Sequence, residues 1–314
     1  MKIALFNDHR PGLVRGDRII DFSHLAGDAV MGLPAVLRMP ALLERFSDIR
    51  PAVEALQGGV PLSEVQLRAP VPRPGKILCA IGNYMEGVSG LVLPLGMFLK
   101  ASNCILDPGG TVVLPKKPAK VFHHEAELCV VIGKGGRDIT PAEAMDHVFG
   151  YTCMMDVSAR GLTSHGRTGW YVDKSYDTFA PLGPWIVTRD EIPNPQKLSI
   201  KLSVDGQPRQ DYNTDDMEHP VAELVSWASE SASLEPGDII SCGTNHQGLG
   251  PLQDGETTTM EIDGIGRLTV NVRDPFGRSW PKEVDTQLAS FVRAARQKMA
   301  DAAVQAKAEA EPAR

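Results

Sequence analysis

Residues 123–133 read HHEAELCVVIG, and this stretch gives the clearest indication of the fold. Its apolar part, residues 128–132, is typical of a buried β-strand that the following glycine ends. Because side chains alternate along a strand, Glu125 and Glu127 are predicted to share one face. Two carboxylates on one face repel each other unless a cation lies between them, and their oxygens suit Mg²⁺, Mn²⁺ or Ca²⁺ better than zinc. A solvated edge strand with two surface glutamates is the alternative.

The chain on both sides of this stretch also favours strands. Between residues 76 and 274, short apolar runs are separated by Gly, Pro and Asp. The runs that predict strands lie at 77–81, 127–132, 185–188, 198–204 and 268–272. Helical patterns are few, with the best at 141–148 and 221–229, and Asp205-Gly206 predicts a β-hairpin. We therefore predict an α+β, β-rich fold of the sandwich or barrel type rather than a doubly wound sheet.

The chain is predicted to divide into three segments. Residues 1–70 form a small N-terminal α+β module. Its predicted elements are strands at 2–6 and 18–22 and helical residues at 35–56. The prolines of the connector APVPRPG at 69–75 are incompatible with a helix or a central β-strand. A boundary is therefore expected here, and a main domain is predicted at 71–285. Residues 286–314 contain 10 Ala and no Gly, which predicts an amphipathic C-terminal helix that packs on the core or lies at a subunit interface.

The composition argues against several classes of partner. Acidic residues outnumber basic ones by 39 to 32, so no nucleic-acid partner is expected, because binding to phosphates depends on clustered Lys and Arg. No membrane partner is expected, since the uncharged stretch 87–99 is shorter than the ~20 residues of a membrane helix. The N-terminal sequence MKIALFND reaches a charged residue, Asp8, before an apolar segment long enough for a signal peptide.

The 5 cysteines form no C-x-x-C pair and are expected to be reduced thiols of a cytoplasmic protein.

Five short motifs follow one another along the chain. They are E-x-E at 125–127, D-x-x-A-R at 156–160, K-S-x-D-T at 174–178, P-G-D at 236–238 and G-T at 243–244. Each motif alone is weak, but the ordered set resembles the fumarylacetoacetate hydrolase (FAH) family over roughly residues 71–274. The resemblance implies an FAH-type mixed β-sandwich or roll core, to which the small N-terminal module and the C-terminal helix are added. It also implies a homodimeric enzyme of aromatic-compound catabolism.

The resemblance further implies a metal site made of Glu125, Glu127 and Asp156. Three carboxylates leave the other positions of an octahedral Mg²⁺, or of Mn²⁺ or Ca²⁺, to water and substrate. Typical substrates of the family present a small 2-oxo acid or a 1,3-dicarbonyl fragment, whose neighbouring oxygens can chelate the ion. The ion then polarises the carbonyl group and stabilises the enolate that forms when a carbon–carbon bond breaks.

The other site residues also come from the resemblance. Lys174 is implied as a catalytic cation that stabilises developing negative charge, and a surface lysine after a turn is the alternative. Arg160 is implied to hold a substrate carboxylate, with a structural ion pair as the alternative. Gly243 permits close approach of the substrate, and Thr244 can donate a hydrogen bond to it. Tyr84, from an N-Y pair typical of the family, is assigned to the substrate site as well.

One family motif is incomplete in this chain. Many hydrolytic members carry N-Y-x-x-H-x-x-E, in which the His and Glu activate water from a mobile lid. Here residues 83–90 read NYMEGVSG, so glycine stands at both positions, Gly87 and Gly90. Glu86 lies one residue away and is expected to point elsewhere. The usual water-activating dyad is therefore missing, although general acid–base help is typically worth ~10²–10⁴-fold in rate.

Histidines are the first replacements to consider. His246 follows the G-T turn, where the family often has proline, and its imidazole suits proton transfer near neutral pH. His124 and His165 are the next candidates for a catalytic role, although a lone loop histidine is usually structural or solvated. Strand alternation favours His123, rather than His124, on the face of the two glutamates. Neither of these two histidines is assigned as a metal ligand.

Three functions are compatible with these residues. The first is a metal-dependent hydrolase that cleaves a carbon–carbon bond in a β-diketo or 2-oxo acid, such as an acylpyruvate or a fumarylacetoacetate-like substrate. The second is a decarboxylase or an isomerase or tautomerase of a 2-oxo acid, which needs no water nucleophile. The third is a catalytically impaired metabolite binder. The apolar residues 91–99 suggest a hydrophobic substituent on the substrate, with ordinary core packing as the alternative.

Overall fold

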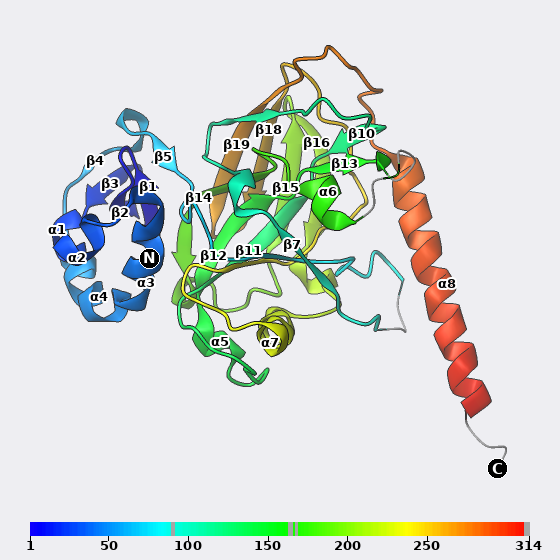
Figure 1. Ribbon diagram of the computed structural model, residues 1–314, viewed down its shortest axis with the longest axis horizontal. Helices are drawn as coiled ribbons and strands as arrows, with labels where there is room; N and C mark the ends of the chain where they lie inside the picture. Colours follow the sequence, from blue (N-terminus) through cyan, green and yellow to red (C-terminus); the bar gives the residue numbers. More distant parts are fainter. Residues whose placement is uncertain (89–91, 163–165, 167–168, 311–314) are drawn as a thin grey trace.

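The computed structural model describes residues 1–88, 92–162, 166 and 169–310 of the chain. In Figure 1 a small N-terminal module, coloured blue, lies on one side of a β-rich body, and a long helix, coloured orange to red, lies on the other. The predicted α+β, strand-rich fold with a C-terminal helix is confirmed. Among the described residues, no helix is both long and apolar enough to cross a membrane.

The N-terminal module consists of short strands and short helices. Its strands are β1 (Lys2–Phe6), β2 (Arg10–Arg15), β3 (Arg18–Asp21), β4 (Val60–Pro61) and β5 (Leu67–Arg68). Its helices are α1 (Ser23–Ala26), α2 (Asp28–Met31), α3 (Arg38–Glu44) and α4 (Phe46–Ala55), with 3-10 turns η1 (Ala35–Leu37) and η2 (Leu62–Glu64). The two predicted strands correspond to β1 and β3, and β2 was not predicted. The helical pattern at 35–56 is interrupted at Arg45, whose φ of −120° and ψ of 10° lie outside the helical region.

The body contains all the strands predicted after residue 76. Its strands are β6 (Ile77–Ala80), β7 (Met97–Lys100), β8 (Ile105–Leu106), β9 (Thr111–Val113), β10 (Val121–His123), β11 (Ala126–Ile132), β12 (Val148–Met155), β13 (Ser158–Arg160), β14 (Ala180–Thr188), β15 (Ser199–Val204), β16 (Gln207–Asn213), β17 (Ile239–Ser241), β18 (Thr257–Ile262) and β19 (Gly266–Arg273). Its helices are α5 (Ala144–His147), α6 (Trp170–Lys174) and α7 (Val221–Ser231), with 3-10 turns η3 (Ser102–Cys104), η5 (Arg189–Glu191) and η6 (Thr214–Asp216). The helix predicted at 221–229 is confirmed by α7. The one predicted at 141–148 is confirmed only in part, because α5 is confined to Ala144–His147 and β12 begins at Val148.

One large sheet runs from the N-terminal module into the body. Its strand order is β4-β3-β2-β1-β14-β12-β11-β17-β6-β7, with β5 beside β1 and β8 beside β14. The two parts join where β1 pairs with β14 in antiparallel orientation, with Lys2 opposite Val187. The connector at 69–75 contains no strand or helix. The division of the chain at residue 70 stays a prediction, and backbone hydrogen bonds cross it.

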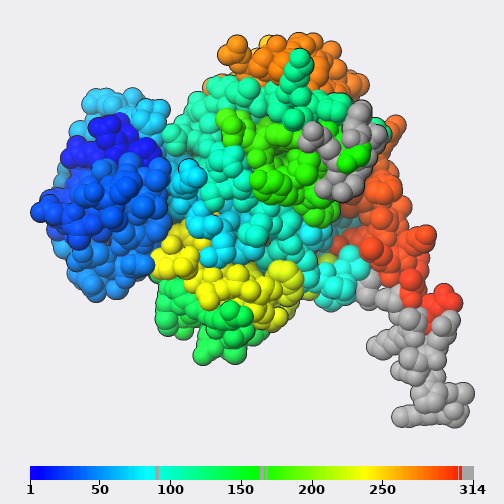
Figure 2. Space-filling view, viewed as in Figure 1, coloured from blue at the N-terminus to red at the C-terminus, as the bar shows by residue number. Residues whose placement is uncertain are grey.

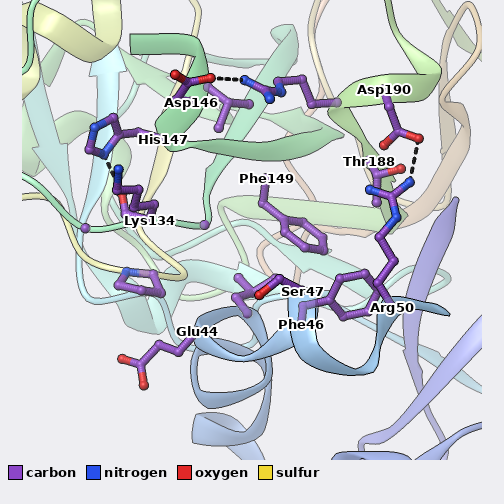
Figure 3. A pocket seen from close by; sticks show the side chains of 16 residues that line it. Glu44, Phe46, Ser47, Arg50, Lys134, Asp146, His147, Phe149, Thr188 and Asp190 are labelled. Carbon is purple, nitrogen blue, oxygen red and sulfur yellow. Dashed lines mark hydrogen bonds and ion pairs between the residues drawn. The ribbon is translucent and has the colours of Figure 1, made fainter. Parts of the chain in front are cut away.

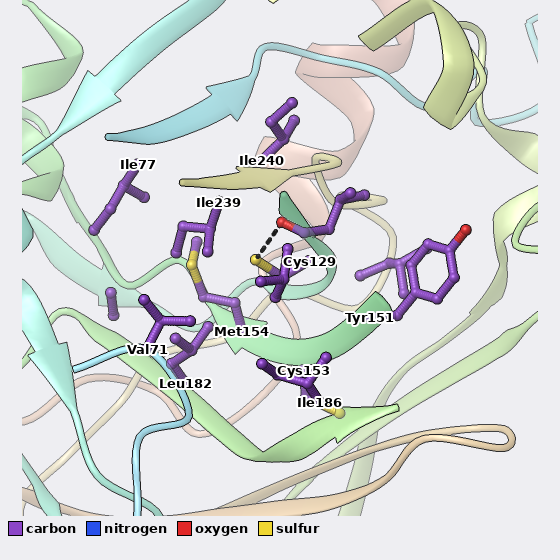
Figure 4. Close-up of a cluster of buried hydrophobic side chains, with 14 of the residues drawn as sticks. Val71, Ile77, Cys129, Tyr151, Cys153, Met154, Leu182, Ile186, Ile239 and Ile240 are labelled. Atoms are coloured by element: carbon purple, nitrogen blue, oxygen red, sulfur yellow. Dashed lines mark hydrogen bonds between the residues drawn. The ribbon is translucent and has the colours of Figure 1, made fainter. Parts of the chain in front are cut away.

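A second sheet packs on the first and encloses the core. Its order is β16-β15-β18-β19-β9, and β15 contacts β11 while β18 and β19 contact β12. The predicted hairpin joins β15 to β16 through Asp205 and Gly206, both with positive φ. Figure 4 shows the core at β11, β12, β14 and β17, where Cys129, Met154 and Ile240 are fully buried. Every residue of β11 is buried, which explains its continuous apolar run.

The C-terminal helix α8 (Thr286–Ala310) is anchored to the body near its middle. Arg296 is buried, forms an ion pair with Glu218 and donates to the Gly82 carbonyl oxygen over 3.0 Å. Other parts of the helix face solvent in this single chain, since Phe291 is 70% exposed. Figure 2 shows the helix, in red, leaving the body at one side. The predicted C-terminal helix is confirmed up to residue 310, and residues 311–314 lie outside the described part.

Candidate active site

Three carboxylates meet at the end of the β11–β12 pair. The antiparallel register places Ala126 opposite Met155. Just beyond this pair, the Asp156 N–H donates to the Glu125 carbonyl oxygen over 2.9 Å. Glu127 follows in β11, and all three carboxylate side chains are buried. One carboxylate oxygen of each lies within 4.8 Å of the other two. The structure thus brings together the three predicted metal ligands.

The carboxylate cluster has the chemistry that a hard divalent cation requires. Ligand oxygens on opposite sides of Mg²⁺ or Ca²⁺ lie about 4 to 5 Å apart, which is close to the span of the cluster. Burial and the charges of Asp156 and Glu125 raise the pKa of Glu127 to about 8. The raised pKa shows that a negative charge on Glu127 is unfavourable in this buried place unless a cation lies beside it. Glu125, Glu127 and Asp156 therefore fit a divalent metal ion.

Two buried lysines lie against the same carboxylates. Lys174, the last residue of α6, places Nζ 2.6 Å from Glu125 Oε2 and 2.5 Å from Asp156 Oδ2. Burial alone would lower the pKa of Lys174, but the two carboxylates raise it, so the ammonium group stays charged. Lys100, at the end of β7, forms an ion pair with the other oxygen of Asp156. Lys100 is absent from the predicted set, although a lysine that ends an apolar run is a signal, since lysine is rarely buried unless paired.

Arg160 connects the carboxylate cluster to β10. Its guanidinium group forms an ion pair with Glu125 Oε1, and its Nε lies 3.4 Å from His123 Nδ1. Burial alone would raise the pKa of Glu125, but Lys174 and Arg160 lower it below its ordinary value. Glu125 is therefore ionised at neutral pH. The Arg160 side chain is 23% exposed, so the group predicted to hold a substrate carboxylate is also engaged in an ion pair.

The turn after β17 holds Glu127 in place. The Gly243 N–H donates to Glu127 Oε2 over 3.0 Å, and the Ser241 hydroxyl donates to the same oxygen. Gly243 has a φ of 86°, and a Cβ there would lie 3.2 Å from the Asn83 Cβ. Thr244 donates through its hydroxyl to the Ala126 carbonyl oxygen over 3.0 Å. In this arrangement Gly243 contacts the carboxylate of Glu127, and the Thr244 hydroxyl is engaged by the protein backbone.

The two histidines before β11 lie outside the cavity described below. His124 is fully buried with Nδ1 3.1 Å from Gln210 Oε1, and burial lowers its pKa to about 3. His123 lies beside Arg160 and places Nε2 3.4 Å from Asp285 Oδ2. The alternation that favours His123 on the face of the glutamates does not apply, because β10 ends at residue 123 and β11 begins at 126. A catalytic role of His124 stays a prediction, and His165 lies outside the described residues.

Tyr84 is packed within the protein near this site. Its ring meets that of Tyr212 edge to face, with 5.0 Å between ring centroids. The side chain is buried, and its hydroxyl finds no hydrogen-bond partner among the described residues. Tyr212 donates its own hydroxyl to the Ala126 carbonyl oxygen. Tyr84 therefore supports the backbone around the cluster, and its contact with substrate stays a prediction.

A cavity of about 270 Å³ opens onto the carboxylate cluster. Its polar lining residues are Glu125, Glu127, Arg160, Lys174, Thr244 and His246. Its apolar lining includes Ile81, Phe98, Trp170, Leu288, Phe291 and Val292. Phe98 and Trp170 stack with their ring centroids 5.8 Å apart, and the last three residues belong to α8. The cavity therefore has a charged end, suited to an oxo acid, and an apolar end, suited to an acyl group.

At the edge of this cavity, His246 contacts a residue that was expected to point elsewhere. Glu86 Oε1 lies 2.5 Å from His246 Nδ1. The expectation for Glu86 is wrong because its backbone takes a positive φ of 54°, which turns the side chain toward His246. Gly87 follows with a φ of 78°, and Gly90 lies outside the described residues. In the sequence, the feature that could have indicated this contact is a glutamate, Glu86, directly before Gly87.

A larger cavity of about 550 Å³ lies between the N-terminal module and the body. Figure 3 shows Arg50 and Phe46 of α4 facing Phe149 and Asp190 across it. Arg50 Nη2 lies 2.7 Å from Asp190 Oδ2, and no group of three potential metal ligands lines this cavity among the described residues. This cavity is larger than the one at the carboxylate cluster, but it lacks that cluster and is not the candidate site.

Comparisons with known proteins agree with the fold and the carboxylate cluster. A maleylpyruvate hydrolase from Aquipseudomonas alcaligenes is 34% identical over 87% of this chain and 99% of its own length. A maleylpyruvate hydrolase from Sphingobium sp. SYK-6, solved in complex with manganese(II) and pyruvate, is 36% identical over 87% of this chain and 99% of its own, with a TM-score of 0.76. A mitochondrial oxaloacetate tautomerase from Bos taurus is 38% identical over 70% of this chain and 74% of its own.

These relatives share a family with the body of this protein. The sequence model of the fumarylacetoacetate (FAA) hydrolase C-terminal domain matches residues 76–273, which contain all three carboxylates of the cluster. The matched region begins just after the proline-rich connector and ends with β19. The family model covers more than half of the chain, and the maleylpyruvate hydrolase from Aquipseudomonas alcaligenes aligns with it over 99% of that enzyme's length. The chain therefore belongs to the fumarylacetoacetate hydrolase family and is an enzyme of that family.

Proposed function

We propose that the protein is a divalent-metal-dependent hydrolase that cleaves the carbon–carbon bond of an acylpyruvate. The observation that carries this proposal is a single cavity in which buried carboxylates, Lys174 and His246 face an apolar end. Two maleylpyruvate hydrolases similar to nearly the whole chain support it, and pyruvate is bound in one of them. Pyruvate is the product that any acylpyruvate hydrolase releases together with a carboxylic acid.

Glu125, Glu127 and Asp156 would hold the metal, and we propose Mg²⁺, with Mn²⁺ or Ca²⁺ as alternatives. When bound, the ion would supply Lewis acidity toward the oxygens of the 2-oxo acid. Arg160 has guanidinium donors beyond its ion pair, and these hold the substrate carboxylate. The ammonium group of Lys174 stabilises the negative charge that develops on the pyruvate fragment as the bond breaks.

The acyl group would occupy the apolar end of the cavity. Phe98 and Trp170 form one wall, and Leu288, Phe291 and Val292 of α8 form the other. These apolar side chains favour an acyl group with apolar carbons. The sequence-based expectation of a hydrophobic substituent from residues 91–99 gains partial support, since Phe98 belongs to this stretch.

A tautomerase that acts on a 2-oxo acid is the second candidate. It is supported by the similarity to the bovine oxaloacetate tautomerase and by the glycine at position 87, because moving a proton along a 2-oxo acid requires no activated water. The carboxylate cluster and Lys174 would serve this reaction equally well, since both reactions pass through an enolate.

Product analysis separates the two functions. The purified protein is incubated with maleylpyruvate, acetylpyruvate or oxaloacetate, with Mg²⁺ or with a chelator, and products are followed by chromatography and by enol absorbance. A hydrolase releases pyruvate and a carboxylic acid from the acylpyruvates only with metal. Glu127→Gln should abolish this release, whereas Glu261→Gln, which breaks an ion pair with Arg267 on the surface, should not. Keto–enol conversion of oxaloacetate without acid release would favour the tautomerase instead.

We also propose a cytoplasmic homodimer. The support is the family resemblance and the 5 buried, unpaired cysteines, which are typical of a reducing compartment. The partly exposed α8, with Phe291 on its surface, is compatible with a subunit contact. Light scattering after size-exclusion chromatography gives the mass in solution, and a mass of one chain at micromolar concentration would contradict the dimer.

A further inference from the structure

Two segments far apart in the chain bring a carboxylate to a histidine at the edge of the cavity. Glu86 lies in the turn that follows β6, and His246 follows the Gly243 turn. Glu86 Oε1 lies 2.5 Å from His246 Nδ1 and accepts the His246 backbone N–H over 3.1 Å. Glu86 Oε2 accepts from Gln247 Nε2 over 2.8 Å. Both carboxylate oxygens therefore bind the segment that carries His246.

The Glu86 carboxylate is held in this place by its surroundings. Its side chain is 1% exposed, whereas that of His246 is 16% exposed and lines the cavity. The Glu86 backbone N–H donates to Asp216 Oδ2 over 3.0 Å, and Asn245 Nδ2 donates to the same oxygen over 3.3 Å. Burial would raise the pKa of Glu86, but the hydrogen bonds from His246 and Gln247 lower it. The carboxylate is thus ionised and fixed against the imidazole.

This contact determines which nitrogen of His246 carries the proton. A carboxylate accepts hydrogen bonds only, so Nδ1 must be the protonated nitrogen of the neutral imidazole. Nε2 then keeps its lone pair and is free to act as a base. The imidazole shares the cavity lining with Glu125 and Glu127, which places it beside the predicted position of the substrate. A carboxylate that fixes the tautomer of a catalytic histidine raises its effectiveness as a base.

We propose that Glu86 and His246 form the water-activating pair of this enzyme, with His246 as the general base and Glu86 as its positioning residue. The proposal rests on the proposed hydrolase function. His246 Nε2 removes a proton from a water molecule as the water oxygen attacks the acyl carbonyl carbon. The carbon–carbon bond then breaks, and its electron pair goes to the departing methylene carbon of pyruvate. That carbon takes up the proton from His246, which restores the neutral imidazole. The products are one carboxylic acid and one pyruvate.

This assignment also explains how the chain can lack the expected dyad. Glycine stands where the family resemblance implies a lid histidine, at position 87, yet a glutamate and a histidine meet beside the same carboxylate cluster. The histidine comes from the segment after the G-T turn, where the family often has proline. The pair therefore supplies the same two groups from a different segment of the chain.

Kinetics of substituted enzymes test the pair with acetylpyruvate as substrate and Mg²⁺ as the metal. We expect His246→Gln to lower kcat by about 10²–10⁴-fold and Glu86→Gln by about 10–100-fold, with KM within threefold of wild type in both. Glu86→Asp keeps the charge and should recover part of the loss. Glu223→Gln is the matched control, because Glu223 Oε2 lies 3.0 Å from His219 Nδ1 in a pair that does not line this cavity. It should leave kcat unchanged.

Two further measurements separate positioning from folding. ¹⁵N NMR of the histidines should show His246 protonated at Nδ1 in the wild type and a mixture of tautomers in Glu86→Gln. Calorimetry should show Mg²⁺ affinity within threefold of wild type in both variants. Wild-type kcat in His246→Gln, or an unchanged tautomer in Glu86→Gln, would overturn the proposal. A wild-type enzyme that hydrolyses no acylpyruvate would refute the proposed function instead, and the tautomer measurement would still decide whether Glu86 positions His246.

Discussion

The metal-free protein should lose stability as the pH rises from 6.5 to 8.5, and Glu127 is the reason. Burial and the charges of Asp156 and Glu125 raise its pKa from 4.5 to about 8 in the folded state. A group whose folded pKa is raised stabilises the protein fully below its unfolded pKa. That contribution is lost as the pH passes through the folded pKa. Ionisation of Glu127 adds a third negative charge to the buried cluster, and this charge opposes folding.

The magnitude follows from the two pKa values. One unit of pKa corresponds to about 1.4 kcal/mol. Between pH 6.5 and 8.5 the linkage relation then gives a loss of about 2 kcal/mol in the free energy of unfolding from Glu127 alone. Burial lowers the pKa of His123 to about 4 and that of His124 to about 3, so neither titrates in the folded protein within this range. The two histidines next to Glu125 therefore add nothing to the titration of the native state in this range.

Urea unfolding at several pH values measures this loss. Wild type and Glu127→Gln are compared after chelation, because the difference between them cancels the titration of all other groups. We expect the wild type to lose about 2 kcal/mol more than the variant between pH 6.5 and 8.5. Saturating Mg²⁺ should remove the difference in pH dependence, since the ion neutralises the ionised cluster and binding releases the proton. Parallel pH curves for the two metal-free proteins would refute the reasoning.

Three further outcomes are expected from single substitutions. Lys174→Met leaves two buried carboxylates without their shared ammonium group, so the metal-free protein should lose about 3–5 kcal/mol of unfolding free energy, measured by urea unfolding. Gly243→Ala would place a Cβ 3.2 Å from the Asn83 side chain at a φ of 86°. The strained turn should disturb the Gly243 N–H that binds Glu127, so Mg²⁺ affinity should fall about 10–100-fold by calorimetry. Trp170→Ala removes one apolar wall and should raise KM about tenfold for acylpyruvates with large apolar acyl groups, but hardly for acetylpyruvate.

Each of these outcomes has a control and a contradicting result. Lys282→Met removes an exposed lysine 3.9 Å from Glu256 and should change stability little; equal losses in both lysine variants would contradict the role of Lys174. Unchanged Mg²⁺ affinity in Gly243→Ala would show that the turn does not support the metal ligand. Tyr171→Ala, at a neighbouring exposed position, is the control for Trp170. Similar KM values with large and small acyl groups would exclude the apolar end as the acyl site.

Much of the fold could be predicted because local patterns decide it. The alternation of apolar runs with Gly, Pro and Asp identified β6, β11, β15, β19 and the end of β14 among the strands of the body. Asp205-Gly206 identified a hairpin, since a tight turn with positive φ needs such residues. The helical pattern at 35–56 is confirmed by η1, α3 and α4, but it did not reveal the break at Arg45, because helical spacing continues through this residue while the helical backbone does not. The short helix α5 was overestimated at both ends, since residues 141–143 form turns and Val148 begins β12.

The candidate site was predicted less evenly. Glu125, Glu127 and Asp156 were identified from ordered motifs, and the β11–β12 register brings them together. Glu86 and Lys100 were missed, because their importance lies in contacts with residues more than fifty positions away along the chain. No local pattern contains such a contact. The side of the strand taken by His123 could not be decided by alternation, because the strand is interrupted between β10 and β11; its ring lies beside Arg160, which pairs with Glu125.

By itself, the amino-acid sequence determined several strands of the body, the ordered acidic motifs and the glycine at the position of the family's lid histidine, because each depends on neighbouring residues or on the order of motifs along the chain. Tertiary structure alone decided the rest. It joined the N-terminal module to the large sheet through β1 and β14, and it brought α8 to the cavity. It also turned Glu86 toward His246. Such pairings form only when the whole chain excludes water from its core, since buried charges are stable only beside partners that folding supplies.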